Sequence, residues 1–161
     1  MTNIMSSIIP FSNEQARTAI NLAQHYDNWV QAERDKRKLA YGMRWAERSG
    51  KEYLYEALDR KGNAKSLGPR SPETEQIFDE YLHRKRSLEH RIDQSKSKLG
   101  ETKVIYRALR MPMISPEAAK ILRKADIREL LGTKLLVVGT NAMPVYSPEA
   151  GGGYKHPTER T

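Results

Sequence analysis

Apolar residues recur at helical spacing over two long stretches of the chain. The first begins at Ser12, which forms a capping-box pattern with Gln15. No proline or glycine follows before Gly42, and we expect the helix to run to Ser49-Gly50, where glycine suits the position after a helix end. Its apolar stripe consists of Ala19, Leu22, Ala23, Tyr26, Trp29 and Val30, and resumes after the charged run 33–38 with Leu39, Met43, Trp45 and Ala46.

A second long helix is predicted over residues 71–109. Ser71 suits the N-cap and Pro72 the first helical position, with Glu73 and Glu75 near the positive end of the helix dipole. We expect an interruption or a kink at Gly100. Two long helices with narrow apolar stripes predict an antiparallel helical arm over residues 12–110.

Between the two predicted helices, the spacing of the apolar residues changes to a two-residue repeat. Tyr53 and Tyr55 alternate with Leu54 in the manner of a strand, and Gly62 in the turn signal at 59–63 can adopt positive φ. The pattern therefore predicts a short β-hairpin at 51–68. The two tyrosines beside Lys51 are able to stack on bases, although alternating tyrosines more often pack across a hairpin.

The last third of the chain predicts a helix, a strand and a second helix over residues 115–146. Ser115-Pro116-Glu117 opens a helix with the densest apolar face of the chain, and Gly132 ends it. The continuous apolar run Leu135–Val138 is typical of a strand buried on both faces. Residues 147–161 are predicted to be a disordered tail.

The predicted strand at 135–138 has no obvious neighbour, because no other segment has comparable apolar density. An unpaired strand would leave backbone donors and acceptors unsatisfied. The simplest interpretation is that its sheet is missing from this chain; pairing with the hairpin or with a second copy is the alternative. We expect marginal order over 115–161, with an exposed Leu135–Val138 segment that is liable to self-associate.

Composition and charge narrow the classes of protein. The elements together predict an α+β fold that is mostly helical. The 161 residues carry a formal net charge of +8, spread along the chain, which favours anionic partners such as nucleic acid, nucleotide phosphates or a membrane surface. The lack of cysteine excludes disulfides, thiolate zinc sites and cysteine nucleophiles. No apolar run spans a bilayer and no basic leader region is present, so we expect a cytoplasmic protein that does not enter a membrane.

Two basic runs on the predicted arm are candidate contacts for a phosphate backbone. Acidic residues interrupt or flank both runs, which favours a solvated helix face over a binding surface. The candidate residues are Arg34, Lys36, Arg37 and Lys38 in the first run, and Arg84, Lys85 and Arg86 in the second.

The turn after the predicted strand is a candidate phosphate site. A glycine at position 139 lets backbone amides approach an oxyanion, and the Thr140 hydroxyl and the helix start at Asn141 can hold a phosphate. The alternative is a plain strand-to-helix turn with Thr140 as the N-cap. This alternative is favoured, because a single Gly-Thr pair is a much weaker signal than a full glycine-rich phosphate-binding motif.

The same region resembles a known family. The segments 115–119, 130–132 and Leu-Leu-Val-Val-Gly-Thr-Asn-Ala at 135–142 resemble the start of the nucleotidyltransferase domain in a bacterial family of the DNA polymerase β-like superfamily. Residues 106–110 are similar to that family's N-terminal helical region, and the similarity covers about residues 15–146. The resemblance implies that Gly139, Thr140 and Asn141 hold the phosphates of a nucleotide, and it implies NTP and Mg²⁺ as cofactors of the full-length form.

One departure from the family pattern concerns the catalytic acids. The superfamily places acid–x–acid on the next strand to hold two metal ions. After Thr140 this chain has only Glu149 and Glu159. No catalytic or metal-binding residue is therefore assigned, and the chain alone is not expected to catalyse. The leading hypothesis is an N-terminal fragment of a nucleotidyltransferase, truncated before its acidic motif; the alternatives are a basic helical module that binds nucleic acid or a protein, and a fragment with no function of its own.

Overall fold

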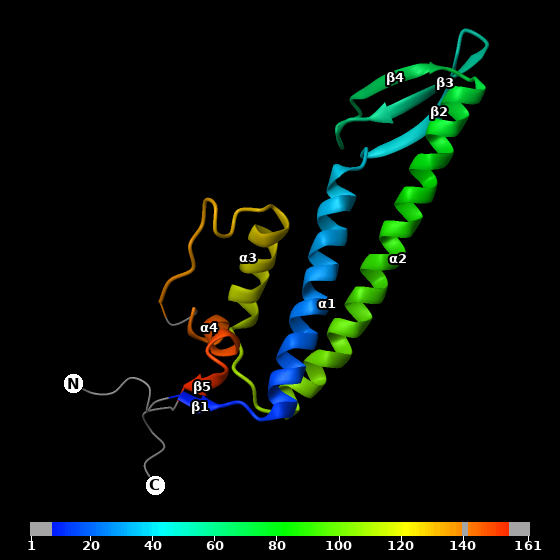
Figure 1. Ribbon diagram of the computed structural model, residues 1–161. Helices are drawn as coiled ribbons and strands as arrows, with labels where there is room; N and C mark the ends of the chain where they lie inside the picture. Colours follow the sequence, from blue (N-terminus) through cyan, green and yellow to red (C-terminus); the bar gives the residue numbers. More distant parts are fainter. Residues whose placement is uncertain (1–7, 140–141, 155–161) are drawn as a thin grey trace. The chain divides into compact units, whose positions relative to one another are not determined.

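The computed structural model describes residues 8–139 and 142–154 and confirms a mostly helical α+β fold (Figure 1). The helices are α1 (Asn13–Lys38), α2 (Pro72–Ala108), α3 (Pro116–Ile127) and α4 (Met143–Glu149). The strands are β1 (Ile8–Pro10), β2 (Gly42–Arg48), β3 (Lys51–Ala57), β4 (Ala64–Pro69) and β5 (Gly152–Tyr154). The chain divides into two compact units: unit 2 is Gln31–Gln94, and unit 1 comprises the parts before and after it. Both long helices contribute to both units.

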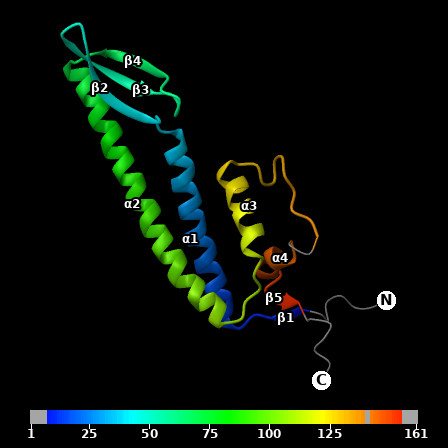
Figure 2. The ribbon, with the colours of Figure 1, turned by 180° about the vertical axis from the view of Figure 1, so that it is seen from behind.

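Serine caps begin three of the helices, as the sequence predicts. At the start of α1 the Ser12 N–H donates to Gln15 Oε1 at 2.9 Å, and the Gln15 N–H donates to Ser12 Oγ at 3.2 Å, which completes a capping box. Ser71 Oγ accepts from the Thr74 N–H at 3.3 Å, and Ser115 Oγ accepts from the Ala118 N–H at 3.2 Å. Helix α2 is continuous through Gly100, so the interruption expected there is absent (Figure 2).

Helix α1 ends at Lys38, and the prediction that it continues to residue 50 is wrong. Residues 42–48 instead form β2, which is joined to β3 by Ser49 and Gly50 with φ of 53° and 73°. Positive φ at both central residues is the geometry of a tight hairpin turn whose twist matches the strands. The glycine thus serves a hairpin turn and not a helix end.

The sheet of unit 2 has the order β2-β3-β4, with both pairs antiparallel. The hairpin predicted at 51–68 is present as β3 and β4, but a third strand flanks it. In the turn between them, Asp59 Oδ1 accepts from the Lys61 N–H at 2.8 Å and from the Asn63 N–H at 3.1 Å, while Gly62 has φ 94°. Strand β3 is therefore central and hydrogen-bonded along both edges.

Unit 1 joins the beginning of α1 to the end of α2 and to α3. Gln15 Nε2 donates to the Leu109 carbonyl at 3.1 Å, and the Tyr26 hydroxyl donates to Asp126 Oδ2 on α3 at 2.8 Å. The Tyr106 hydroxyl donates to the Pro112 carbonyl at 2.9 Å, and burial raises the pKa of this tyrosine. Buried apolar residues of this unit are Val30, Tyr106, Met111, Ala125 and Ala142.

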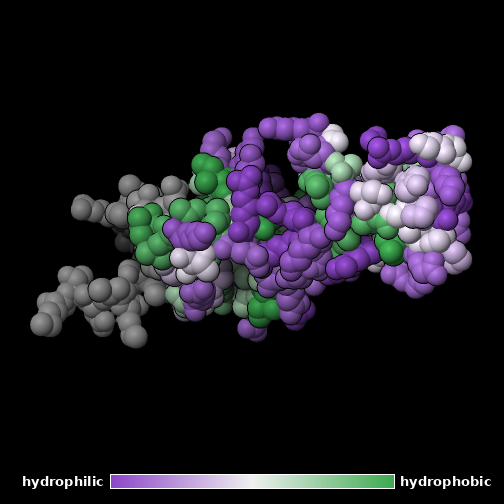
Figure 3. Space-filling view, turned by 90° about the horizontal axis from the view of Figure 1, so that it is seen from above, coloured by the Kyte–Doolittle hydropathy of each residue, from purple (hydrophilic) through white to green (hydrophobic). Residues whose placement is uncertain are grey.

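The segment 134–138 does not form the buried strand that its composition predicts. Leu131 and Leu135 make one isolated bridge, and the side chains of Leu135, Leu136 and Val138 are 49%, 79% and 72% exposed. A strand needs a neighbour for its backbone groups, and in the described part of the chain no strand lies beside this segment. The exposure expected for Leu135–Val138 is confirmed. Figure 3 shows exposed hydrophobic residues in green among the hydrophilic surface of the protein.

The predicted disordered tail also has secondary structure at its start. Residues 147–149 complete α4, and β5 pairs antiparallel with β1, with Ile9 opposite Gly153. Glycines at 152 and 153 take part in this pairing although they carry no strand signal in the sequence. Residues 155–161 lie outside the described part of the chain.

Candidate nucleic-acid interface

One face of the sheet in unit 2 packs against α2. Leu54 at the centre of β3 is fully buried, and its cross-strand partner Trp45 makes an edge-to-face contact with Phe78 of α2 at 5.8 Å between ring centroids. Side chains of a strand alternate between its two faces, and cross-strand partners share a face. The register therefore assigns each paired strand residue of unit 2 to the helix-facing side or to the outer side; Leu67, at the irregularity between the Leu54 and Tyr55 pairs, has no partner.

The carboxylates of the sheet all lie on one of these two faces. Every acidic residue of the three strands, Glu47, Glu52 and Glu56, is on the helix-facing side, because Glu52 is opposite Glu47 and Glu56 is opposite Met43. The outer side holds Arg44, Arg48 and Lys51, all of them exposed, and no acidic strand residue. The charged strand residues of the outer side are thus all cations, whereas the helix-facing side holds the three carboxylates and also Lys65, opposite Glu56.

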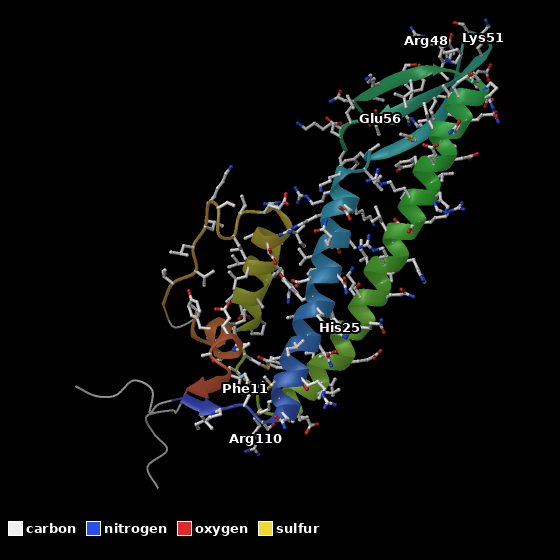
Figure 4. The ribbon with its side chains drawn as sticks, in the orientation of Figure 1. Phe11, His25, Arg48, Lys51, Glu56 and Arg110 are labelled. Carbon is white, nitrogen blue, oxygen red and sulfur yellow. The ribbon has the colours of Figure 1, made fainter. Side chains whose placement is uncertain are left out.

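Two tyrosines occupy the centre of the outer side. Tyr53 and Tyr55 are half-buried on β3, and Arg44 on β2 is directly opposite Tyr55. At one end of this row Arg48 and Lys51 are cross-strand partners at the β2–β3 turn, where Figure 4 labels both side chains. A half-buried aromatic pair bordered by exposed cations is a suitable surface for bases and phosphates.

The side chains of the outer-face cations and tyrosines have no polar or ring partner in the described part of the chain. Among residues 8–139 and 142–154, no ion pair involves Arg44, Arg48 or Lys51, and no hydrogen bond or ring contact involves the side chain of Tyr53 or Tyr55. On the helix-facing side, by contrast, Trp45 contacts the Phe78 ring and the Arg70 guanidinium. The three exposed cations, and the uncovered part of each half-buried tyrosine ring, remain available to a ligand.

The helix-facing side is fixed by a cluster around Arg70. The guanidinium Nη1 is 2.6 Å from Glu52 Oε2, and Nε is 2.7 Å from Glu75 Oε1. The same guanidinium lies 5.1 Å from the Trp45 ring centroid. The hydrogen bonds that Arg70 donates to Glu75 and Glu52 raise its pKa, and the side chain is charged at every relevant pH. The cluster ties β3 and β2 to the start of α2 and so holds the sheet in position.

The basic runs predicted as nucleic-acid contacts both lie in unit 2, but on helices with acidic neighbours. On α1, Lys36 Nζ is 3.2 Å from Glu89 Oε1 and Lys38 Nζ is 3.8 Å from Asp35 Oδ1. Arg34 also has an interaction within the protein, whereas Arg37 is exposed. On α2, the Lys85 ammonium lies 5.9 Å from the Tyr81 ring centroid, and Arg84 and Arg86 are exposed. The ion pairs on α1 favour the solvated-face interpretation of that run.

The predicted phosphate loop is only partly described. Gly139 has φ 80°, and a Cβ added there would meet no atom within 4 Å. Thr140 and Asn141 lie outside the described residues, and the α4 N-cap is Ala142, which makes no side-chain cap bond. No group of three or more His, Cys, Asp or Glu residues in the described part could hold a metal ion. With only Glu149 and Glu159 beyond the loop, the residues present do not fit a two-metal centre.

Sequence reasoning missed Arg44 and Arg48 because it placed them on a helix. The available signal was the alternation of Met43 and Trp45 with charged residues before Ser49-Gly50, a pair suited to a hairpin turn. Recognising β2 would have placed both arginines beside the two tyrosines.

Comparison with known proteins adds no relative: no family model, no curated protein and no solved structure matches the chain. Among the helices of the described ranges, none has the length and apolarity needed to cross a membrane.

Proposed function

We propose that unit 2 binds nucleic acid through the outer side of its sheet. The observation that carries this proposal is the segregation of charge, with Arg44, Arg48 and Lys51 on a side that has no acidic strand residue. Cations without carboxylate neighbours attract phosphates and release counterions when they bind them. The helical run on α1 is the weaker candidate, because Lys36 and Lys38 already have carboxylate partners.

Fluorescence anisotropy of a labelled oligonucleotide, single-stranded and as its duplex, tests this proposal with the full chain. We expect the logarithm of the association constant to fall linearly with the logarithm of the salt concentration. The double variant Arg44→Ala/Arg48→Ala should weaken binding to the preferred form and reduce the slope by about 1.4, at roughly 0.7 per phosphate contact for a single strand.

The matched control is Arg123→Ala/Lys124→Ala, which removes the same charge from two exposed residues of α3 in unit 1. This control should retain the salt slope of the unmodified chain. Equal losses in the two double variants would show that net charge alone drives binding, and absence of salt-dependent binding to either form would overturn the proposal. The variants Arg84→Ala/Arg86→Ala then measure any share of the α2 run.

We further infer that the chain is the N-terminal part of a nucleotidyltransferase-fold protein. The resemblance over residues 115–146 supports this, and so does the exposure of Leu136 and Val138, because an apolar run that belongs to a larger sheet is exposed without it. Nucleotidyl transfer from an NTP with Mg²⁺ would then belong to the longer protein. Reading the genomic DNA after codon 161 in all three frames tests this. We expect an acid–x–acid strand there, and a stop codon without such a strand in any frame would overturn it.

A further inference from the structure

The outer side of the sheet offers two aromatic rings at a defined spacing. Tyr53 and Tyr55 are two residues apart on one face of β3, and a strand rises about 3.3 Å per residue, so the rings are roughly 7 Å apart along it. Successive bases in a duplex are about 3.4 Å apart along one strand. The spacing of the rings thus suits the separated bases of an extended strand.

The neighbours of the two rings leave room for such bases. Across the sheet, Tyr53 lies between Ala46 and Pro69, and Tyr55 lies between Arg44 and Ser66. Three of these four neighbours are small, so the tyrosines are the bulkiest apolar groups of the outer side. Neither ring packs on another aromatic ring within the described residues.

We propose that Tyr53 and Tyr55 stack on two bases of a single-stranded nucleic acid whose phosphates contact Arg44, Arg48 and Lys51. This inference rests on the proposed function and names its substrate class. A duplex keeps its base faces within the helical stack and can offer only phosphates and groove edges to this surface. Every base has a π-face, so stacking on the two rings is tolerant of sequence.

The test compares single strands of DNA and of RNA with their duplexes, using Tyr53→Ala, Tyr55→Ala and the matching Phe variants of the full chain. Each Ala variant should weaken binding of the single strand by about tenfold, because base–aromatic stacking is worth that much, and should leave the salt slope unchanged. The Phe variants should retain binding, since stacking needs the ring and not the hydroxyl. The control is Tyr41→Ala, which removes a 55% exposed tyrosine of unit 2 that lies outside the sheet.

A second measurement uses the unmodified protein and so does not depend on how the Ala variants fold. Photocrosslinking with a strand that contains 5-iodouracil, followed by peptide mass spectrometry, should place the crosslink on Tyr53 or Tyr55. Salt-dependent binding that is equal for duplex and single strand, with crosslinks only elsewhere, overturns the stacking inference and leaves the proposed function standing. Loss of all salt-dependent binding instead overturns the proposed function itself.

Discussion

The Arg70 guanidinium lies 5.1 Å from the centroid of the Trp45 ring while it forms ion pairs with Glu52 and Glu75. One side chain thereby joins β2, β3 and the first turn of α2. The planar fork of arginine makes this arrangement possible, because it can present separate N–H groups to two carboxylates and a flat face to an aromatic ring. The cluster thus links the helix-facing side of the sheet to α2.

We therefore expect Arg70→Lys to loosen the contact although it preserves charge. A lysine ammonium is a compact charge and does not stack on Trp45 while it bridges two acids. In a Trp29→Phe background, where Trp45 is the remaining tryptophan, its emission should move to longer wavelength. The control is Arg86→Lys at an exposed position of α2. Unchanged Trp45 emission in Arg70→Lys would contradict the role given to the cluster.

Leu54 is the largest fully buried apolar side chain, and its truncation should destabilise unit 2. Leu54→Ala removes buried methyl groups and leaves a cavity, which costs about 2–5 kcal/mol of unfolding free energy. Urea denaturation followed by circular dichroism measures this loss. Leu58→Ala, the same substitution at a 58% exposed leucine just after β3, should cost no more than about 0.5 kcal/mol. Similar losses in both variants would mean that Leu54 does not lie in a packed core.

The turn between β3 and β4 should be sensitive to acid. The Asn63 side chain donates to Asp59 Oδ2 at 2.7 Å, and this bond, with the backbone N–H donors of the turn, lowers the pKa of Asp59 below 3.8. A group with a depressed folded pKa stabilises the fold above its unfolded pKa, and that contribution is lost as the pH falls through the folded pKa. The β3–β4 turn should therefore open at low pH and not near neutrality.

NMR titration of the Asp59 carboxyl carbon checks the shift directly. The Asn63→Ala variant lacks the side-chain hydrogen bond that lowers the Asp59 pKa most, so this pKa should rise toward 3.8. An unchanged Asp59 pKa in this variant would show that the backbone donors alone set it.

The exposed apolar segment after α3 should promote self-association. Leu136 and Val138 are 79% and 72% exposed, and an unpaired apolar segment can pair with another copy. Leu136→Asp should lower the sedimentation-average mass at high concentration without loss of helix content. Val104→Asp, at a 69% exposed position on α2, is the control for added charge. If the unmodified protein is monomeric at every concentration, the prediction of self-association is wrong.

Local signals in the sequence were enough to locate the long helices. The capping pattern of Ser12 and Gln15 and the Ser71-Pro72 opening place helix starts within one residue of those observed, because capping depends on groups within a few residues. The turn at Asp59–Asn63 was predicted for the same reason. The α+β class followed from these elements.

The sequence alone did not reveal strand β2, or which residues lie on the helix-facing side and which on the outer side of the sheet. Residues 39–50 are compatible with either a helix or a strand, and pairing with β3 and packing of Trp45 on Phe78 decide between them. The run Leu135–Val138 has the composition of a buried strand but no partner to pair with, so it stays exposed. By itself the sequence determined the charge, the starts of the three longer helices and their serine caps; only the tertiary structure placed Arg44 beside Tyr55, because strand register is set by contacts between residues far apart in the chain.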